Sequence, residues 1–328
     1  MAVYTQVPAE TLAKFLERYD VGTLRAAKGI AEGVENSNYL VDTSGADGNG
    51  ARFILTLYEK RVDVNDLPFF FDLLDHLSRQ GCAVPRFIPD REGKVLQELC
   101  GRPACLIEFL SGISVTEPTP AQARSAGAAL GKLHGCAESF AGSRPNALGP
   151  EGWHRLAESC GAHLDDIAPG LHDRVRAELA FLDTRWPNAL DHCVIHADLF
   201  PDNVLMQGDA VGGLIDFYFS CTDIRAYDVA ITHGAWSFSP DGATFKADVG
   251  HALTAGYRES HGLTAEEYAA LPILGRGAAL RFLLTRAYDW INTPPGALVT
   301  RKDPLAYLRR LETYATATPE ALFGPAPQ

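Results

Sequence analysis

The sequence has no long hydrophobic run and no surplus of positive charge. Its 328 residues contain no window of about 18 uninterrupted apolar residues, which a membrane-spanning helix would need. The first residues have no basic start followed by an apolar stretch, so they do not predict a secretory signal. Asp and Glu (41) outnumber Lys and Arg (29), and the net charge of −12 disfavours binding to nucleic acid or to an anionic membrane.

The sequence also lacks the common signatures of metal, disulfide and nucleophile chemistry. Its seven cysteines are odd in number and include no C-x-x-C pair, which is typical of a chain in a reducing compartment. Neither G-x-x-x-x-G-K-[ST], nor G-x-S-x-G, nor H-E-x-x-H occurs. We therefore expect a soluble, acidic, cytoplasmic protein.

The first third of the chain has the apolar pattern of short strands. Segments 36–43 and 51–59 read as two strands, and the Gly- and Asp-rich turn between them predicts an antiparallel hairpin. A helix is expected over 66–81, with Asp66 as its cap and Gly81 at its end.

From about residue 119 the pattern changes to Ala- and Leu-rich helical periodicity. Strands interrupt this pattern only around 194–217. We expect an α+β fold with a strand-rich N-terminal lobe over 1–106, a hinge at 107–112 and a larger, mainly helical C-terminal lobe over 113–328, with a cleft at the junction.

One stretch, HADLFPDN at 196–203, concentrates polar groups between apolar strands. It is followed by a further hairpin and by Asp216, thirteen residues after Asn203. The pattern H-x-D-L-x-P-x-N with a later Asp is that of a kinase catalytic loop and its metal-binding Asp. The alternative is a solvated turn rich in Asp and Asn, which the flanking apolar strands disfavour.

Phosphoryl transfer to a hydroxyl gives each of these residue types a role. A carboxylate must orient the hydroxyl and accept its proton, and Asp198 fits this role of catalytic base. Oxygen ligands must hold Mg²⁺ on the ATP phosphates, and Asn203 and Asp216 fit that role. We expect His196 to hold the backbone of the loop.

These motifs resemble the aminoglycoside-phosphotransferase and choline-kinase branch of the protein-kinase-like fold. Phe200 stands where protein kinases carry a Lys, and DFY at 216–218 replaces D-F-G, which points to a small-molecule acceptor. Asp228 resembles the buried Asp that anchors the catalytic loop in this family, although a simple helix cap is the alternative. His134 is expected to pack at the end of a helix.

The resemblance leaves the group that binds the ATP phosphates open. In this fold the third strand carries a Lys or Arg that pairs with a Glu of the next helix, but Thr56 stands at that position and 66–81 contains no Glu. Lys28, Arg52 and Lys60 are alternative sources of the charge.

Backbone groups are the other candidates for binding ATP. We expect phosphates at the backbone N–H groups of a Gly- and Asn-containing segment, namely Gly33, Asn36, Ser37 and Asn38. An ordinary strand–turn–strand is the alternative for this segment. Adenine is expected to contact the backbone of Glu108 and Phe109.

Further segments resemble the homoserine kinases of this superfamily. They are GVENSNYLV, FILTLYEK, LPFFFDLLDHL, VIHADLFPDNVL, LIDFYFSCTDIRAYDVAI, RFLLTRAYDW and KDPLAYLRRL. Together they span about 28–312. The resemblance implies transfer of the ATP γ-phosphate to the side-chain hydroxyl of L-homoserine, a step towards threonine.

A zwitterionic acceptor requires a cation for its carboxylate and an acidic or neutral acceptor for its ammonium group. Arg281 or Arg286 is the expected cation, and Asp223 or Tyr218 is expected to position the amine. The alternative is that these arginines form structural salt bridges, for example with Asp289.

Two other readings remain at this stage. The same chemistry could use choline, methylthioribose, hydroxylysine or an aminoglycoside, although a polycation would want acids and 276–290 is net basic. The absent Lys–Glu pair could instead indicate a nucleotide-binding pseudokinase, which the intact Asp198, Asn203 and Asp216 oppose. A homo-oligomer is compatible with the sequence.

Overall fold

The computed structural model describes residues 4–30, 36–59, 63–294 and 301–327. The chain divides into two compact units, Met1–Ser111 and Gly112–Gln328. The first is built on a sheet and the second is mainly helical, so the predicted α+β class is confirmed. The functional roles assigned to the two parts stay predictions.

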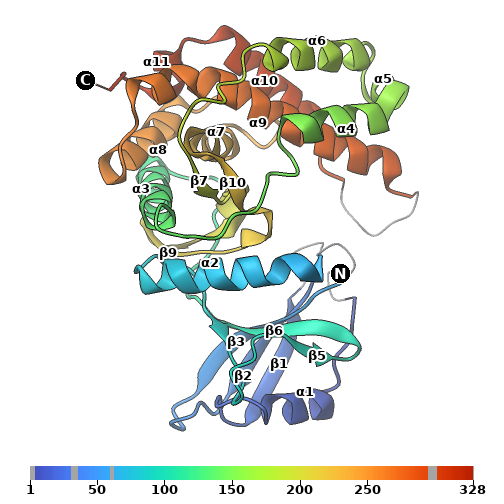
Figure 1. Ribbon diagram of the computed structural model, residues 1–328, viewed down its shortest axis with the longest axis vertical. Coiled ribbons are helices and arrows are strands. Elements are labelled where there is room, and N and C mark those ends of the chain that lie inside the picture. The colour runs from blue at the N-terminus through green and yellow to red at the C-terminus, as the bar shows by residue number, and fades with distance from the viewer. Residues whose placement is uncertain (1–3, 31–35, 60–62, 295–300, 328) are drawn as a thin grey trace. The chain divides into compact units, whose positions relative to one another are not determined.

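The N-terminal unit contains an antiparallel sheet with the strand order β1–β2–β3–β6–β4, in which β5 also pairs with β6 (Figure 1). The strands are β1 (Leu24–Ile30), β2 (Ser37–Thr43), β3 (Ala51–Leu57), β4 (Phe87–Ile88), β5 (Gln97–Leu99) and β6 (Arg102–Glu108). β2 and β3 form the predicted hairpin, with Thr43 opposite Ala51.

Helix α1 (Ala9–Leu16) covers one face of this sheet. Because side chains alternate along a strand, only every second residue of β2 and β3 faces the helix. The core of this unit is made by Leu12, Phe15, Leu16, Tyr19, Tyr39, Val41, Leu55, Leu57 and Leu106. The opposite face therefore carries the intervening residues of the same strands.

Helix α2 (Leu67–Arg79) forms where it is predicted, but its capping differs. Asp66 stands at the N-cap position as predicted, but its side chain makes no capping hydrogen bond. A 3₁₀ turn, η1 (Val64–Asp66), leads into the helix instead, and the Asp63 carboxylate accepts the Asn65 N–H at 2.9 Å. The helix stops before Gly81, whose φ of +79° suits glycine.

The C-terminal unit has nine helices and two pairs of antiparallel strands in its described residues. The helices are α3 (Pro120–Ala137), α4 (Pro150–Cys160), α5 (Leu164–Ile167), α6 (Leu171–Asp183), α7 (Arg225–Trp236), α8 (Ala247–Ser260), α9 (Ala265–Asn292), α10 (Leu305–Thr316) and α11 (Pro319–Phe323). Strand β7 (His192–Ile195) pairs with β10 (Cys221–Ile224), and β8 (Val204–Gln207) pairs with β9 (Ala210–Leu214).

Two glycines allow α3 and α8 to pack backbone against backbone. A Cβ on Gly127 would lie 2.0 Å from the Leu253 carbonyl oxygen, and a Cβ on Gly256 would lie 2.0 Å from the Arg124 carbonyl oxygen. Neither distance is possible for a side chain. This close approach brings residues of α3 and α8 together behind the candidate site.

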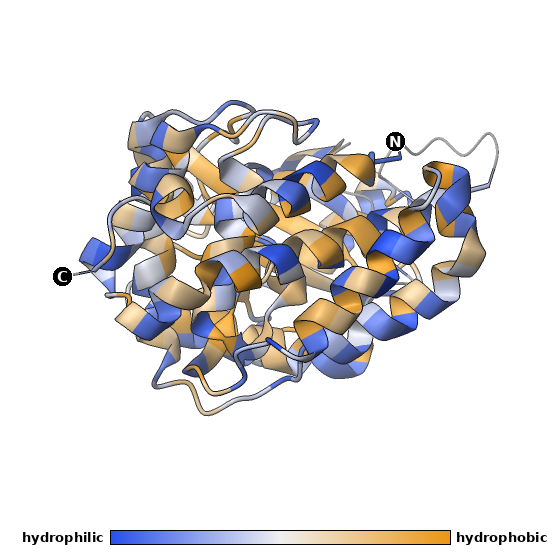
Figure 2. Cartoon of the chain, turned by 90° about the horizontal axis from the view of Figure 1, so that it is seen from above, coloured by the Kyte–Doolittle hydropathy of each residue, from blue (hydrophilic) through white to orange (hydrophobic). Residues whose placement is uncertain are grey.

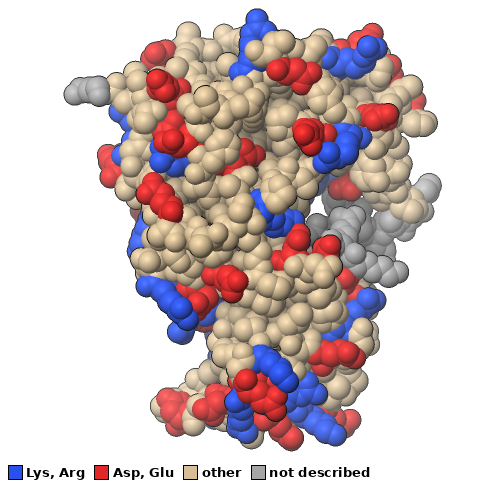
Figure 3. Space-filling model, viewed as in Figure 1, with Lys and Arg blue, Asp and Glu red and all other residues tan. Residues whose placement is uncertain are grey.

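Surface properties are those of an acidic globular chain. Its helices carry hydrophobic and hydrophilic residues on different faces (Figure 2), and charges of both signs are interspersed on the face in Figure 3. Among the described residues, no helix combines the length and apolar character needed to cross a membrane. None of the seven cysteines, all within the described ranges, forms a disulfide.

Candidate active site

The HADLFPDN segment lies in the C-terminal unit between β7 and β8 and closes with the 3₁₀ turn η3 (Pro201–Asn203). Strands β8 and β9 form a hairpin, which brings the start of β8 next to the end of β9. At these ends the Ile215 N–H donates to the Asn203 carbonyl oxygen at 3.0 Å. Asn203 therefore lies beside the residue that precedes Asp216, at one end of the hairpin.

Asn203 also contacts the predicted base directly. Its Nδ2 donates to the Asp198 backbone oxygen at 2.8 Å and to the Asp198 carboxylate at 3.3 Å. Because the amide nitrogen is used in this way, the Asn203 Oδ1 is the atom that remains for a cation. Asp216 is exposed and has a φ of +65°, in the left-handed region that non-glycine residues rarely adopt. Such backbone strain is often kept at functional sites.

His196 is fully buried and binds the backbone on both sides of its ring. Its Nε2 lies 3.0 Å from the Ile215 carbonyl oxygen, and the Asp198 N–H donates to its Nδ1 at 3.2 Å. This pattern requires a neutral ring with the proton on Nε2. Burial lowers the pKa of His196, which favours the same neutral form.

Asp228 is buried in α7 and holds the start of the loop. Its carboxylate accepts the N–H groups of His196 at 2.7 Å and of Ala197 at 2.9 Å. Burial alone would raise the pKa of Asp228, but the hydrogen bond from His134 and the groups of the loop lower it. These hydrogen bonds join residues far apart in the sequence, and the N-cap of α7 is Ile224. The contacts therefore do not support the alternative that Asp228 is a simple helix cap.

The sequence did not predict the contacts of His134 with Asp228 and Tyr257. The buried His134 ring lies between the Asp228 carboxylate, 3.1 Å from Nε2, and the Tyr257 hydroxyl, 2.9 Å from Nδ1. His134 belongs to α3 and Tyr257 to α8, the two helices whose glycines allow close packing. No local sequence pattern could reveal this series of hydrogen bonds, because His134 is separated from its two partners by 94 and 123 positions.

Arg281 of α9 lies beneath the loop and is only 2% exposed. Its Nη1 donates to the Ala197 carbonyl oxygen at 2.5 Å. The guanidinium lies over the rings of Phe282, at 4.6 Å, and Phe219, at 5.6 Å. Its role in binding the acceptor stays a prediction.

Arg286 lies five residues further along α9 and has a different environment. Its Nη1 donates to the Asp303 carbonyl oxygen at 3.1 Å, and its guanidinium lies 4.5 Å from the Tyr307 ring centre. Burial lowers the pKa of Arg286, and the negative charges of nearby groups oppose this effect, those of Tyr307 and Asp303 more than that of Asp198. Within the described ranges, Arg286 forms no ion pair with Asp289 or any other carboxylate.

The two residues predicted to position the amine lie in the segment after Asp216. Tyr218 is in the 3₁₀ turn η4 (Phe217–Phe219), and Asp223 is in β10. The Asp223 carboxylate is 8% exposed and accepts the Asn146 side-chain amide at 2.6 Å. Both assignments stay predictions.

The segment predicted to bind phosphates is only partly described, because Gly33 lies outside the described residues. Asn36 and Ser37 are buried. The Asn36 side-chain oxygen accepts the Glu59 N–H at 3.4 Å, and the Ser37 hydroxyl donates to the Glu59 carboxylate at 2.7 Å. These side chains thus stabilise the start of β2, and any contact they make with ATP would be through the backbone.

Thr56, at the position of the expected Lys, is only 4% exposed. Its hydroxyl donates to the Asn38 side-chain oxygen at 2.8 Å, directly across the β2–β3 pair. Of the alternative cations, Arg52 forms an ion pair with Asp42 at 3.0 Å. A neutral hydrogen bond between Thr56 and Asn38 is therefore found where the charged Lys or Arg was expected.

Lys28 of β1 shares a sheet face with this neutral pair. The strand register places Lys28 opposite Leu40 and Leu40 opposite Ile54, two residues before Thr56. Residues opposite one another, and residues two apart, lie on the same face. Lys28 is exposed. Lys60, the third alternative, lies outside the described residues.

Glu108 and Phe109, predicted to contact adenine, lie at the end of β6. The Glu108 N–H donates to the Arg86 carbonyl oxygen at 2.8 Å, and its carboxylate binds the Arg86 guanidinium at 3.1 Å. Among the described residues the Phe109 N–H has no such partner. Of these two backbone N–H groups, that of Phe109 is therefore the one available to donate to adenine.

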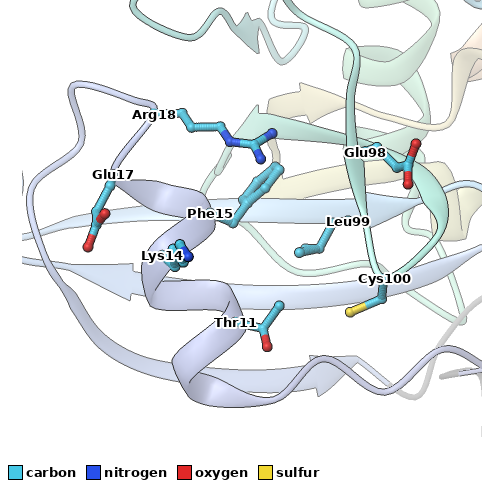
Figure 4. A pocket seen from close by; sticks show the side chains of 8 residues that line it. All are labelled: Thr11, Lys14, Phe15, Glu17, Arg18, Glu98, Leu99 and Cys100. Atoms are coloured by element: carbon cyan, nitrogen blue, oxygen red, sulfur yellow. The ribbon is translucent and has the colours of Figure 1, made fainter.

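A separate depression lies within the N-terminal unit, between α1 and the end of β5 (Figure 4). Lys14, Phe15, Arg18, Glu98 and Cys100 are among the residues that line it. None of the residues predicted to bind ATP or the acceptor is among them, so this depression has no part in the candidate site.

Comparison with known proteins agrees with the geometry. The model of the family described as "Phosphotransferase enzyme family" matches residues 26–263. The structure resembles an amicoumacin kinase solved with AMP-PNP (TM-score 0.71, 16% identity, 94% of each chain) and a microcompartment-associated aminopropanol kinase (TM-score 0.67, 19% identity, 97% and 100%). The predicted protein-kinase-like fold is thereby confirmed, and the family model is that of a phosphotransferase.

The most informative similarities are in sequence. Homoserine kinase from Sinorhizobium medicae is 50% identical over 324 residues, covering 99% of this chain and 98% of its own. Homoserine kinase from Zymomonas mobilis is 52% identical over 324 residues, covering 98% and 99%. The chain belongs to the phosphotransferase enzyme family and, within it, to the homoserine kinases. The predicted family and enzyme class, an ATP-dependent phosphotransferase, are confirmed.

Proposed function

We propose that this chain transfers the γ-phosphate of ATP to the side-chain hydroxyl of L-homoserine, a step of threonine biosynthesis. The observation that carries the proposal is the Asp198 loop in a chain with homoserine kinase relatives over nearly its whole length. Asp198 orients the hydroxyl and accepts its proton while the oxygen attacks the γ-phosphorus, and ADP leaves.

The residues at the end of the β8–β9 hairpin fit Mg²⁺. This ion prefers oxygen ligands and is commonly held by one or two protein groups together with substrate phosphates. Asn203 Oδ1 and the Asp216 carboxylate would hold it, and when bound it would neutralise charge on the phosphates. The described residues contain no group of three or more His, Cys, Asp or Glu side chains suited to hold a metal without substrate.

We further propose that residues 1–106 bind ATP, that 107–112 act as a hinge and that 113–328 carry the base and the acceptor site. Phosphates would contact backbone groups over 33–38, supported by a cation for which the shared sheet face favours Lys28. Adenine would contact the backbone of Glu108 and Phe109. A cytoplasmic location and a homo-oligomer stay predictions.

The acceptor site would lie beside Asp198. Arg286 would bind the homoserine carboxylate, because within the described residues its guanidinium donates to a carbonyl oxygen and is not neutralised by a carboxylate ion pair. Asp223 or Tyr218 would position the ammonium group. Arg281 was the alternative ligand for the carboxylate, but its bond to the Ala197 carbonyl oxygen favours Arg286 for this role.

The reaction is tested by measuring ADP release from the purified chain with ATP and Mg²⁺. The acceptors are L-homoserine, L-serine, L-threonine, choline, methylthioribose, hydroxylysine and kanamycin. Turnover confined to homoserine supports the proposal. Turnover on another hydroxyl compound would keep the mechanism and overturn the acceptor. ATP binding without any turnover would favour the pseudokinase.

Replacing Arg286 by Leu tests the carboxylate site. The homoserine KM is expected to rise about 10- to 100-fold, because a charge-assisted hydrogen bond contributes about 1.5–3 kcal/mol. The KM for ATP should stay within a factor of about two. Steady-state kinetics with each substrate varied in turn provide the measurement.

Arg309→Leu is the matched control, because Arg309 also contacts Asp303, at 3.5 Å from its carboxylate. It should leave both KM values near those of the unmodified enzyme. An unchanged homoserine KM in Arg286→Leu would remove Arg286 from the site.

A further inference from the structure

Ala197, immediately before the base, has an unusual backbone conformation. Its φ is +64°, and it is one of only three non-glycine residues with positive φ in the described part of the chain. The left-handed region is unfavourable for L-residues other than Gly, Asn and Asp. Ala197 is also 1% exposed, so the surrounding contacts must maintain this conformation.

The peptide bond that joins Ala197 to Asp198 is held at both of its polar atoms. The Ala197 carbonyl oxygen accepts from Arg281 Nη1 at 2.5 Å. The Asp198 N–H donates to His196 Nδ1 at 3.2 Å. Asp228 holds the Ala197 N–H at 2.9 Å on the preceding peptide. Rotation of the Ala197–Asp198 peptide would redirect the Asp198 side chain, so these contacts set the direction of the base.

Arg281 is suited to this task by its burial and its surroundings. At 2% exposure its cation is partly compensated by the carbonyl dipole and by the ring of Phe282, on which it lies at 4.6 Å, while its buried Nε has no hydrogen-bond partner among the described residues. The Phe282 ring in turn contacts the ring of Phe200, two residues after the base, with centroids 5.0 Å apart. Two successive residues of α9 thus support the loop.

We propose that Arg281 is a positioning residue, which acts on the reaction by fixing the Ala197–Asp198 peptide and not by binding the acceptor. This inference rests on the proposed function of Asp198 as the base. Under this proposal a change at Arg281 alters kcat, and Arg286 is the residue that binds the acceptor carboxylate.

The variants Arg281→Met and Arg281→Lys test this role. Met removes the hydrogen-bond donor and keeps much of the side-chain volume. Lys keeps a charged hydrogen-bond donor, but its side chain is shorter. We expect Arg281→Met to lower kcat about 100-fold, because small displacements of a reacting group have effects of this size. The KM values for ATP and homoserine should change less than about threefold, and Arg281→Lys should recover part of kcat.

An acceptor without a carboxylate separates positioning from binding. 3-Aminopropan-1-ol has the hydroxyl and amine of homoserine but no carboxylate. If Arg281 acts on Asp198, the Met variant lowers kcat in the same proportion for both acceptors. The opposite result has three parts: the homoserine KM rises, kcat is unchanged, and the reaction of 3-aminopropan-1-ol is unaffected. That result would mean that Arg281 binds the carboxylate, and it would overturn the proposal.

The control is Arg276→Met on the same helix. Arg276 is partly buried and pairs with Glu178, at 2.6 Å, but does not contact the loop. It should lower the melting temperature and leave kcat of the folded enzyme unchanged. If Arg281→Met does not fold, Arg281→Lys alone decides: a reduced kcat with unchanged KM values supports the proposal, and an unchanged kcat overturns it. Absence of turnover on homoserine by the unmodified chain would instead contradict the proposed function.

Discussion

Replacing Asp198 by Asn is expected to lower kcat for homoserine-dependent ADP release by about 10²- to 10⁴-fold, the usual contribution of a general base. Asn has nearly the same shape and can still contact the acceptor hydroxyl, but it cannot accept the proton. The KM for ATP should change little, because Asp198 is not expected to bind the nucleotide. Steady-state kinetics and a melting curve of the same sample provide the measurement.

Asp202→Asn is the matched control for this substitution. Asp202 lies four residues further along the same loop and is exposed, and among the described residues only its backbone oxygen accepts a hydrogen bond, from Ser114. The control should retain almost full kcat. A retained kcat in Asp198→Asn, with a folded protein, would show that another group accepts the proton and would remove Asp198 as the base.

The candidate site could be predicted where its residues are close in sequence. Asp198, Asn203 and Asp216 lie within one loop and the hairpin that follows it, so their spacing alone indicates that they meet. The alternation of apolar residues likewise predicts the β2–β3 hairpin, since side-chain direction reverses at every residue of a strand. Local periodicity was therefore sufficient for these elements.

Contacts between distant segments could not be read in the same way. His134 reaches Asp228 only because α3 and α8 approach one another at Gly127 and Gly256, and Arg281 reaches Ala197 across 84 positions. No periodicity in one segment encodes which other segment it will contact. The left-handed conformation of Ala197 is equally hidden, because alanine itself does not favour it.

Replacing Asp228 by Ala is expected to reduce the free energy of unfolding by about 3–5 kcal/mol, the usual effect of removing one partner from a buried charged network. The substitution leaves the N–H groups of His196 and Ala197 and the ring of His134 without their acceptor. Each buried donor without a partner costs about 1–3 kcal/mol. Urea unfolding at pH 7, followed by circular dichroism, provides the measurement.

Asp248→Ala on α8 is the control, because Asp248 is exposed and its carboxylate, within the part of the chain that the structure describes, accepts only the neighbouring Val249 N–H. It should change the free energy of unfolding by less than about 0.5–1 kcal/mol. A similar small change in Asp228→Ala would show that other contacts hold the loop.

The same variant has a defined dependence on pH. The folded protein lowers the pKa of Asp228, so the charged carboxylate contributes stability that is complete above the pKa of an unfolded Asp, about 4. That contribution is lost as the pH falls through the lower pKa of the folded state. The stability difference between the unmodified chain and Asp228→Ala should therefore stay constant from pH 8 to about 5 and become smaller below about 4. A difference that grows with acidification would mean that Asp228 is neutral in the folded protein, and the anchoring of the loop would then rest on its N–H contacts with an uncharged carboxyl.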